Sequence, residues 1–113
     1  MTLNSGAHKE VLLNLISFSI DLSRLKKQLA LVDWDQTEEL VTLNFFHVKN
    51  VIERFLSGGI SVKELEDWAN LLECREDLNF ENEYVEGVIY RLANPVLEGE
   101  ISEAICRGIL EKQ

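Results

Sequence analysis

The chain has 113 residues, 46% of them hydrophobic, which suits one domain that buries a core without disulfides or metals. It carries 11 basic and 20 acidic residues, so its net charge is −9. Such a surface repels phosphate backbones, which argues against nucleic-acid binding, and attracts basic proteins. The excess is uneven, because residues 1–60 hold 6 basic and 7 acidic residues whereas residues 61–113 hold 5 and 13. An acidic face is therefore expected in the second half.

Cysteine content and hydropathy narrow the class of protein further. Cys74 and Cys106 are too few and too poorly spaced for a disulfide framework or a zinc site, so we expect free thiols and no metal or cofactor. The most apolar stretch, residues 11–20, is too short to span a bilayer, and no cleavage site of a secretory signal follows it. We therefore expect a cytoplasmic protein with no membrane partner, present as a monomer or weak dimer.

The N-terminal part of the chain predicts two helices. Residues 1–7 are polar and are expected to fray. In residues 11–22 a strand-like alternation competes with a helical period, and we favour the helix because long-range strand partners are hard to find. Asp21 or Ser23 can cap a second helix. Its core positions are Leu25, Leu29 and Val32, and its outer face carries the basic residues Arg24, Lys26 and Lys27.

The middle of the chain predicts a loop and then an antiparallel helix pair. Asp33–Gln36 reads as a loop in which Trp34 fills a gap between helices, and residues 38–43 either stay extended or open the next helix. Asn44 is a good N-cap for a helix over residues 45–56, and Gly58 suits the left-handed residue that ends it. Ser61 and Glu64 then form a capping box for a helix that continues to Glu73.

The C-terminal part predicts two further helices. Residues 74–80 lack periodicity and read as a connection, and residues 81–93 form a helix that ends at Asn94-Pro95. Ser102 can cap a last helix whose Ile105, Ile109 and Leu110 close the core. Residues 1–113 are thus expected to form a single all-α domain, an irregular bundle of four to six short helices.

Few residues offer catalytic chemistry. The two histidines are His8, near the terminus, and His47, which we expect to be an exposed or half-buried structural residue. No nucleophile elbow, phosphate loop, dinucleotide-binding glycine pattern or helical zinc motif occurs. The acids Glu73, Glu76 and Asp77 do not follow the calcium-loop spacing, and we interpret them as a solvated charged face. We do not expect an enzyme.

A protein-binding surface is the better hypothesis. On the predicted helix over residues 81–93, Glu83, Glu86 and Tyr90 project away from the apolar positions, which places an aromatic anchor in an acidic stripe. The alternative is that Tyr90 lies flat on its neighbours. We add Glu64 and Asp67 of the capped helix to the predicted partner-binding residues, although Asp67 can also form an ordinary ion pair with Lys63.

Several short sequences carry a family resemblance. They are Trp34-Asp35, Glu39–Leu43, Gly59-Ile60-Ser61, Leu65–Asn70, Leu72–Asp77 and Leu92–Pro95. Over roughly residues 20–113 the chain resembles a family of small bacterial proteins, some of which are immunity proteins of contact-dependent growth inhibition and related toxin systems. Asp33 replaces the proline and Cys74 the glycine that other members usually carry. The resemblance implies that the shared motif holds the fold, with Arg75 paired to Glu73, Glu76 or Asp77.

The resemblance implies an antitoxin function that agrees with the charge. Toxin nucleases are generally basic because they bind nucleic acid, and an acidic protein can cover that surface after fast, electrostatically steered association. We therefore expect an immunity protein that masks a basic toxin nuclease domain stoichiometrically. The alternative is a cytosolic interaction or regulatory module without a toxin partner.

Overall fold

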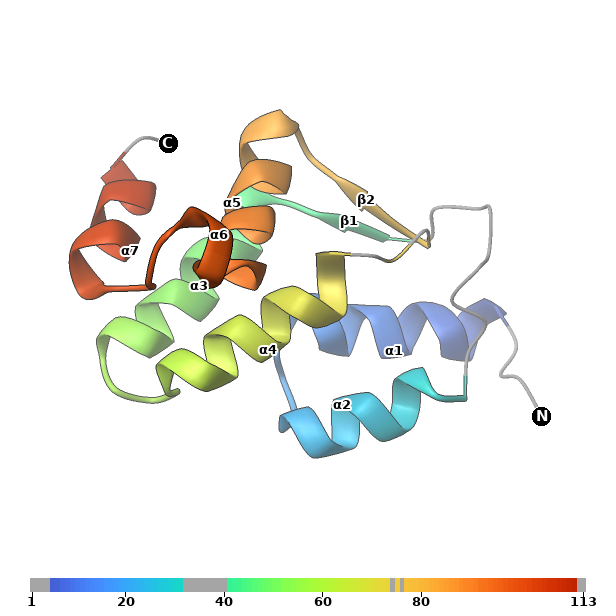
Figure 1. Ribbon diagram of the computed structural model, residues 1–113. Helices are drawn as coiled ribbons and strands as arrows, with labels where there is room; N and C mark the ends of the chain where they lie inside the picture. Colours follow the sequence, from blue (N-terminus) through green and yellow to red (C-terminus); the bar gives the residue numbers. More distant parts are fainter. Residues whose placement is uncertain (1–4, 32–40, 74, 76, 112–113) are drawn as a thin grey trace.

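The structure is a computed structural model that describes residues 5–31, 41–73, 75 and 77–111. These residues form seven helices, more than the four to six expected, and one small sheet. The predicted all-α class is confirmed apart from the two short strands. The elements are α1 (Ser5–Ser17), α2 (Leu22–Leu29), β1 (Val41–Leu43), α3 (Phe45–Leu56), α4 (Val62–Glu73), β2 (Leu78–Phe80), α5 (Glu83–Ala93), α6 (Pro95–Glu98) and α7 (Glu103–Glu111). α1 and α2 lie at one end of the molecule, and α6 and α7 lie at the other (Figure 1).

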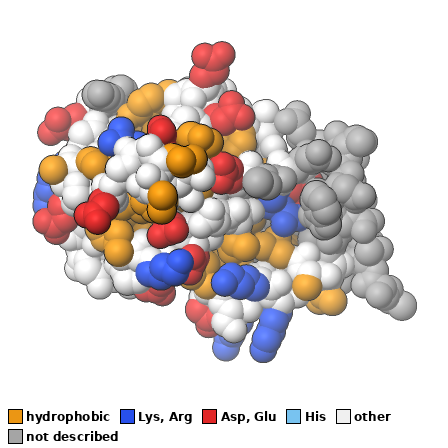
Figure 2. Space-filling view, viewed as in Figure 1, with side chains coloured by type: hydrophobic (Ala, Val, Ile, Leu, Met, Phe, Trp, Pro, Cys, Tyr) orange, Lys and Arg blue, Asp and Glu red, His pale blue; other side chains and the backbone are white. Residues whose placement is uncertain are grey.

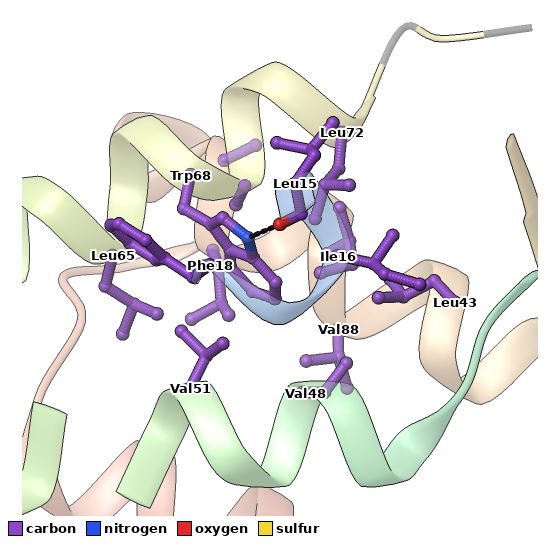
Figure 3. Packing of buried hydrophobic residues seen from close by; sticks show 14 of the residues in the cluster. Leu15, Ile16, Phe18, Leu43, Val48, Val51, Leu65, Trp68, Leu72 and Val88 are labelled. Atoms are coloured by element: carbon purple, nitrogen blue, oxygen red, sulfur yellow. Dashed lines mark hydrogen bonds between the residues drawn. The ribbon is translucent and has the colours of Figure 1, made fainter. Parts of the chain in front are cut away.

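Helix α4 is the element that the others surround, because it contacts α1, α2, α3 and α5. Its predicted capping box is confirmed: the Ser61 N–H donates to Glu64 Oε1 at 2.9 Å, and the Glu64 N–H donates to Ser61 Oγ at 3.1 Å. Trp68 is fully buried, and its indole N–H donates to the Leu15 carbonyl at 2.6 Å (Figure 3). This bond ties α4 to the end of α1 inside the core.

Helix α1 confirms the helical interpretation of residues 11–17, but its bounds differ from the prediction. It begins at Ser5, within the residues 1–7 that were expected to fray, and it ends at Ser17. Phe18 stops it by adopting a left-handed backbone with φ of 50°, which is unusual for a bulky residue. Arg54 holds this turn, because its Nη1 donates to the Phe18 carbonyl at 2.7 Å and its guanidinium lies 4.9 Å from the ring centre.

Helix α2 begins as predicted and ends earlier. Asp21 caps it by accepting from the Arg24 N–H at 2.9 Å. Leu25 and Leu29 are buried as predicted, but the helix ends at Leu29, and Val32 lies outside the described residues. The predicted loop with Trp34 also lies outside them.

Strands β1 and β2 form a parallel pair that the sequence analysis did not find. Val41 pairs with Leu78 and Leu43 with Phe80, so the connection predicted over residues 74–80 contains a strand. Residues 41–43 are extended rather than helical, which decides between the two alternatives for this part of residues 38–43. A parallel pair needs a long crossover, and here the α3–α4 hairpin supplies it.

The remaining boundaries follow the predicted caps. Asn44 caps α3, and Gly58 takes a left-handed φ of 86° in the turn to α4. Asn82 caps α5, which therefore begins two residues later than expected, and Ser102 Oγ accepts from the Ile105 N–H at 3.2 Å at the start of α7. Pro95 ends α5 and also opens the one-turn helix α6, which was not predicted.

Candidate interaction surface

Helix α5 presents the three predicted binding residues on its solvent face. Its apolar side is buried in the core through Val85, Val88, Ile89 and Leu92. Because these residues recur at three- and four-residue steps, Glu83, Glu86 and Tyr90 must point away from the core, and all three are exposed. Tyr90 leaves 44% of its surface accessible, which is high for an aromatic side chain.

These three side chains stand around a shallow hollow of about 540 Å³. Its lining residues are Glu73, Phe80, Glu83, Glu86, Gly87, Ile89 and Tyr90. Glu73 comes from α4 and is held by Asn94, whose Nδ2 donates to its Oε1 at 3.0 Å. The hollow therefore has an apolar and aromatic part beside three carboxylates, a combination that suits a cationic side chain with an aliphatic stem.

A second hollow of about 490 Å³ lies between α5 and α7 and shares Glu83 and Gly87 with the first. Tyr84 of α5 links the two helices, because its hydroxyl donates to the carbonyl of Ile109 in α7 at 2.7 Å. Arg91 lines this hollow, and its Nε is buried without a hydrogen-bond partner among the described residues. The surface of α5 is thus hollowed on both sides of Gly87.

The other two predicted binding residues, Glu64 and Asp67, lie on α4 and not on α5. They are partly buried on α4 and line neither hollow. The Glu64 carboxylate accepts from the Ser61 N–H, and Asp67 pairs with Lys63 at 3.1 Å. Hydrogen bonding to Asp67 raises the pKa of Lys63. The structure therefore does not bring them together with Glu83, Glu86 and Tyr90.

Carboxylates without ion-pair partners cover the last three helices. Among the described residues, no lysine, arginine or histidine forms an ion pair with the exposed Glu83, Glu86, Glu98, Glu100, Glu103 or Glu111. The basic residues Arg24, Lys26 and Lys27 are exposed on α2 instead. In Figure 2 acidic side chains are scattered over the part where α5, α6 and α7 lie, with a few basic ones among them, and more basic side chains lie along the lower edge.

One ionic cluster is buried, which the sequence analysis missed. His8 Nε2 lies 2.7 Å from Asp77 Oδ2, and Arg75 contacts the same carboxylate through Nε at 2.9 Å and Nη2 at 2.8 Å. Burial opposes ionisation of Asp77, but hydrogen bonds from Arg75 and His8 outweigh it and lower its pKa. Asp77 is therefore not part of a solvated face, and its pairing with Arg75 agrees with the expected role of that arginine.

This cluster has the residue types of an acid–base site but the surroundings of a structural one. His8 is 1% and Asp77 0% exposed, and in the described part of the chain their side-chain hydrogen bonds run only within the cluster. The cluster joins residues 69 positions apart, and no local pattern in the sequence signals such a contact. It fixes the beginning of α1 to the segment that leads into β2.

The remaining candidates for chemistry are isolated. His47 is half-buried and caps its own helix, because its Nδ1 accepts from the Asn44 N–H at 3.1 Å. Cys106 is a buried free thiol whose pKa burial raises to about 11. Over the described ranges, no three His, Cys, Asp or Glu side chains cluster closely enough to hold a metal ion. None of the helices in those ranges combines the length and the apolar content that crossing a membrane requires.

Comparison of the chain with protein-family models, curated proteins and solved structures gave no match.

Proposed function

We propose that this protein binds and neutralises a basic toxin domain, most simply a nuclease, by covering its active or substrate-binding surface. The observation that carries the proposal is the exposed group Glu83, Glu86 and Tyr90, which surrounds a hollow on α5 and has no lysine or arginine paired to it within the described residues. The partner supplies the missing cations. Neutralisation is stoichiometric and needs no reaction on either protein.

The charge distribution supports fast recognition of such a partner. Residues 61–113 hold 13 acidic and 5 basic residues, and five exposed acids on the last three helices form no ion pair with a described residue: Glu83, Glu86, Glu98, Glu103 and Glu111. A surface of this kind steers a basic protein toward it before contact, and the association rate then falls as salt is added. The family resemblance supports a toxin as the partner, because immunity proteins occur among the relatives that it implies.

Tyr90 is the expected anchor of the complex. Exposed tyrosines near the centre of an interface contribute strongly because the ring buries a large area at a small entropic cost. Glu83 and Glu86 flank it on the same helix face, so a lysine or arginine of the partner can lie over the ring while its charge meets a carboxylate. Glu73 forms the far side of the same hollow.

The test compares two triple variants against the toxin domain encoded beside the gene. Glu83→Lys, Glu86→Lys and Tyr90→Ala together should raise the dissociation constant at least about a hundredfold, since hot-spot residues each contribute about 2 kcal/mol or more. The matched control Glu10→Lys, Glu53→Lys and Phe46→Ala makes the same charge change and removes one exposed aromatic elsewhere. It should retain most of the affinity.

Calorimetric titration at low and physiological salt measures both variants, and Tm checks their folding. All six side chains are exposed, but Glu83 and Glu86 lie in the first turn of α5, where lysine opposes the helix dipole. Tm should therefore fall by no more than about 10 °C in the first variant and change little in the control. Absence of a complex between the wild type and the toxin domain at low salt would overturn the proposal. A complex that leaves nuclease activity intact would favour the regulatory module instead.

A further inference from the structure

The one-turn helix α6 holds two aliphatic side chains out in solvent. Val96 is 96% and Leu97 71% exposed, the highest fractions among the large hydrophobic residues of the described chain. The turn is hydrogen-bonded, because the Leu97 and Glu98 N–H groups donate to the Asn94 carbonyl at 3.0 and 2.9 Å. Pro95 sets its start and Gly99, with φ of 107°, its end. A defined turn, rather than a loose loop, therefore presents these side chains.

The exposed pair adjoins a groove between α6 and the beginning of α4. The groove has a volume of about 670 Å³ and is lined by Val62, Glu66, Pro95, Val96, Gly99, Glu100 and Ile101. Val62 is itself 45% exposed. Aliphatic side chains from two elements therefore line the groove, and Leu97 is exposed on the same turn as Val96. In Figure 2 hydrophobic side chains lie among acidic ones in this part of the molecule.

The rim of this surface is acidic. Glu66 and Glu100 line the groove, and Glu98 is exposed on α6 itself. Glu98 and Glu100 form no ion pair with any described residue, although Glu98 also lines the hollow between α5 and α7 that contains Arg91. Lys63, the basic residue of α4, is hydrogen-bonded to Asp67 and interacts with Glu66. An apolar centre with a mainly acidic rim is complementary to an apolar segment that carries cations at its edges.

We propose that Val96, Leu97 and the adjoining groove bind an apolar segment of a partner protein that is flanked by lysine or arginine residues. The acidic rim repels anionic lipid surfaces, and two copies of this chain joined through the patch would bring Glu98 and Glu100 of both copies together. The inference goes beyond the proposed function, because the segment is defined by its chemistry and does not require the partner to be a toxin.

The probe is a short fluorescein-labelled peptide in which a leucine-rich segment is flanked by lysines. Two matched peptides carry glutamate in place of lysine, or serine in place of leucine. Fluorescence anisotropy should give a dissociation constant at least about tenfold lower for the lysine–leucine peptide than for either counterpart, because only this peptide satisfies both the apolar centre and the rim.

Variants then locate the bound peptide. Val96→Ser with Leu97→Ser should raise the dissociation constant of the lysine–leucine peptide about tenfold or more, and Glu98→Lys with Glu100→Lys should also weaken its binding and flatten its salt dependence. The matched control is Phe46→Ser, because Phe46 is 65% exposed but lies on α3 near Lys49. It should leave the affinity unchanged. Circular dichroism confirms that each variant is folded.

Several outcomes would overturn the inference. These are no binding of the lysine–leucine peptide, equal binding of the glutamate peptide, or equal effects of the α6 and Phe46 variants. Sedimentation that shows a wild-type dimer lost in the α6 variant would assign the patch to a second copy, and binding to phosphatidylserine vesicles would assign it to membranes. Failure of the toxin complex with successful peptide binding would reject the proposed function alone.

Discussion

The imidazole of His47 performs a task that usually falls to glutamate or glutamine, because it closes the capping box at the start of α3. Its Nδ1 accepts from the Asn44 N–H at 3.1 Å, and Asn44 Oδ1 accepts from the His47 N–H at 3.2 Å. Nδ1 can accept only when it carries no proton, so this hydrogen bond needs the neutral ring with its proton on Nε2. Burial lowers the pKa of His47 from its ordinary 6.5, and the nearby Glu81 carboxylate opposes this effect.

The cap makes folding stability depend on pH near neutrality. Because the pKa of His47 is lower in the folded than in the unfolded chain, the unfolded chain binds more protons as the pH falls below 6.5. The contribution of the cap is complete above pH 6.5 and is lost as the pH falls through the folded pKa. His47→Gln keeps an acceptor that does not titrate, so its Tm should fall less than that of the wild type between pH 7.5 and 5. A parallel fall in both proteins would contradict this role.

At the scale of elements, replacing glycine by alanine should have opposite effects on stability at Gly58, in the turn between α3 and α4, and at Gly87, within α5. Gly58 has φ of 86°, where an L side chain is strained, so Gly58→Ala should reduce the free energy of unfolding by about 1–2 kcal/mol. Gly87 lies within α5, and an added Cβ there would meet no atom within 4 Å. Gly87→Ala should therefore increase the free energy of unfolding by about 0.5–1 kcal/mol.

Urea denaturation of the two variants with unchanged m-values would measure these changes directly. Gly108→Ala is a matched comparison for Gly87→Ala, because a Cβ at Gly108 in α7 also meets nothing within 4 Å. It should likewise increase the free energy of unfolding. A decrease in the free energy of unfolding of Gly87→Ala would contradict this expectation, because it would mean that other atoms occupy the space beside Gly87.

Elements with local start and stop signals were predicted well from sequence. α3 and α4 depend on caps at Asn44 and Ser61 and on Gly58, all of which act within a few residues. The strands depend on a partner far along the chain: Val41 pairs with Leu78, and three residues show too little alternation to reveal a strand. The early end of α1 was missed because Phe18 adopts a left-handed turn that the contacts of Arg54 hold in place.

The candidate surface also has one part that could be predicted from sequence and one part that could not. The exposure of Glu83, Glu86 and Tyr90 follows from the helical period of α5, which the sequence shows. Val96 and Leu97 were not predicted as part of a surface, because an isolated pair of aliphatic residues after Asn94-Pro95 carries no period from which its exposure can be read.

At the scale of the whole molecule, the buried cluster of His8, Arg75 and Asp77 connects the first helix to the sheet. Asp77→Asn leaves Arg75 charged and buried without its counterion, so the free energy of unfolding should fall by about 3–5 kcal/mol. Asp67→Asn removes the carboxylate of a surface ion pair with Lys63, whose side chain is 71% exposed, and should change stability little. Chemical denaturation measures both, and similar small effects would show that the cluster is dispensable.

The same cluster predicts the acid limit of the fold. Because the pKa of Asp77 is lowered from its ordinary 3.8, its contribution is present above that pH and is lost as the pH falls through the folded value. The difference in stability between the wild type and Asp77→Asn should therefore shrink as the pH falls below about 4. A difference that persisted in strong acid would assign the effect of the substitution to packing.

The two long-range attachments of α1 also bear on synthesis of the protein. Leu15 and Trp68 are 53 positions apart, and His8 and Asp77 are 69 apart, whereas α3 and α4 are neighbours that can pair as soon as both exist. A ribosome releases the amino-terminal segment first, yet the two groups that attach it, Trp68 and Asp77, follow their partners by 53 and 69 residues. Part of the apolar side of the first helix therefore stays uncovered until the residues up to Asp77 have been made.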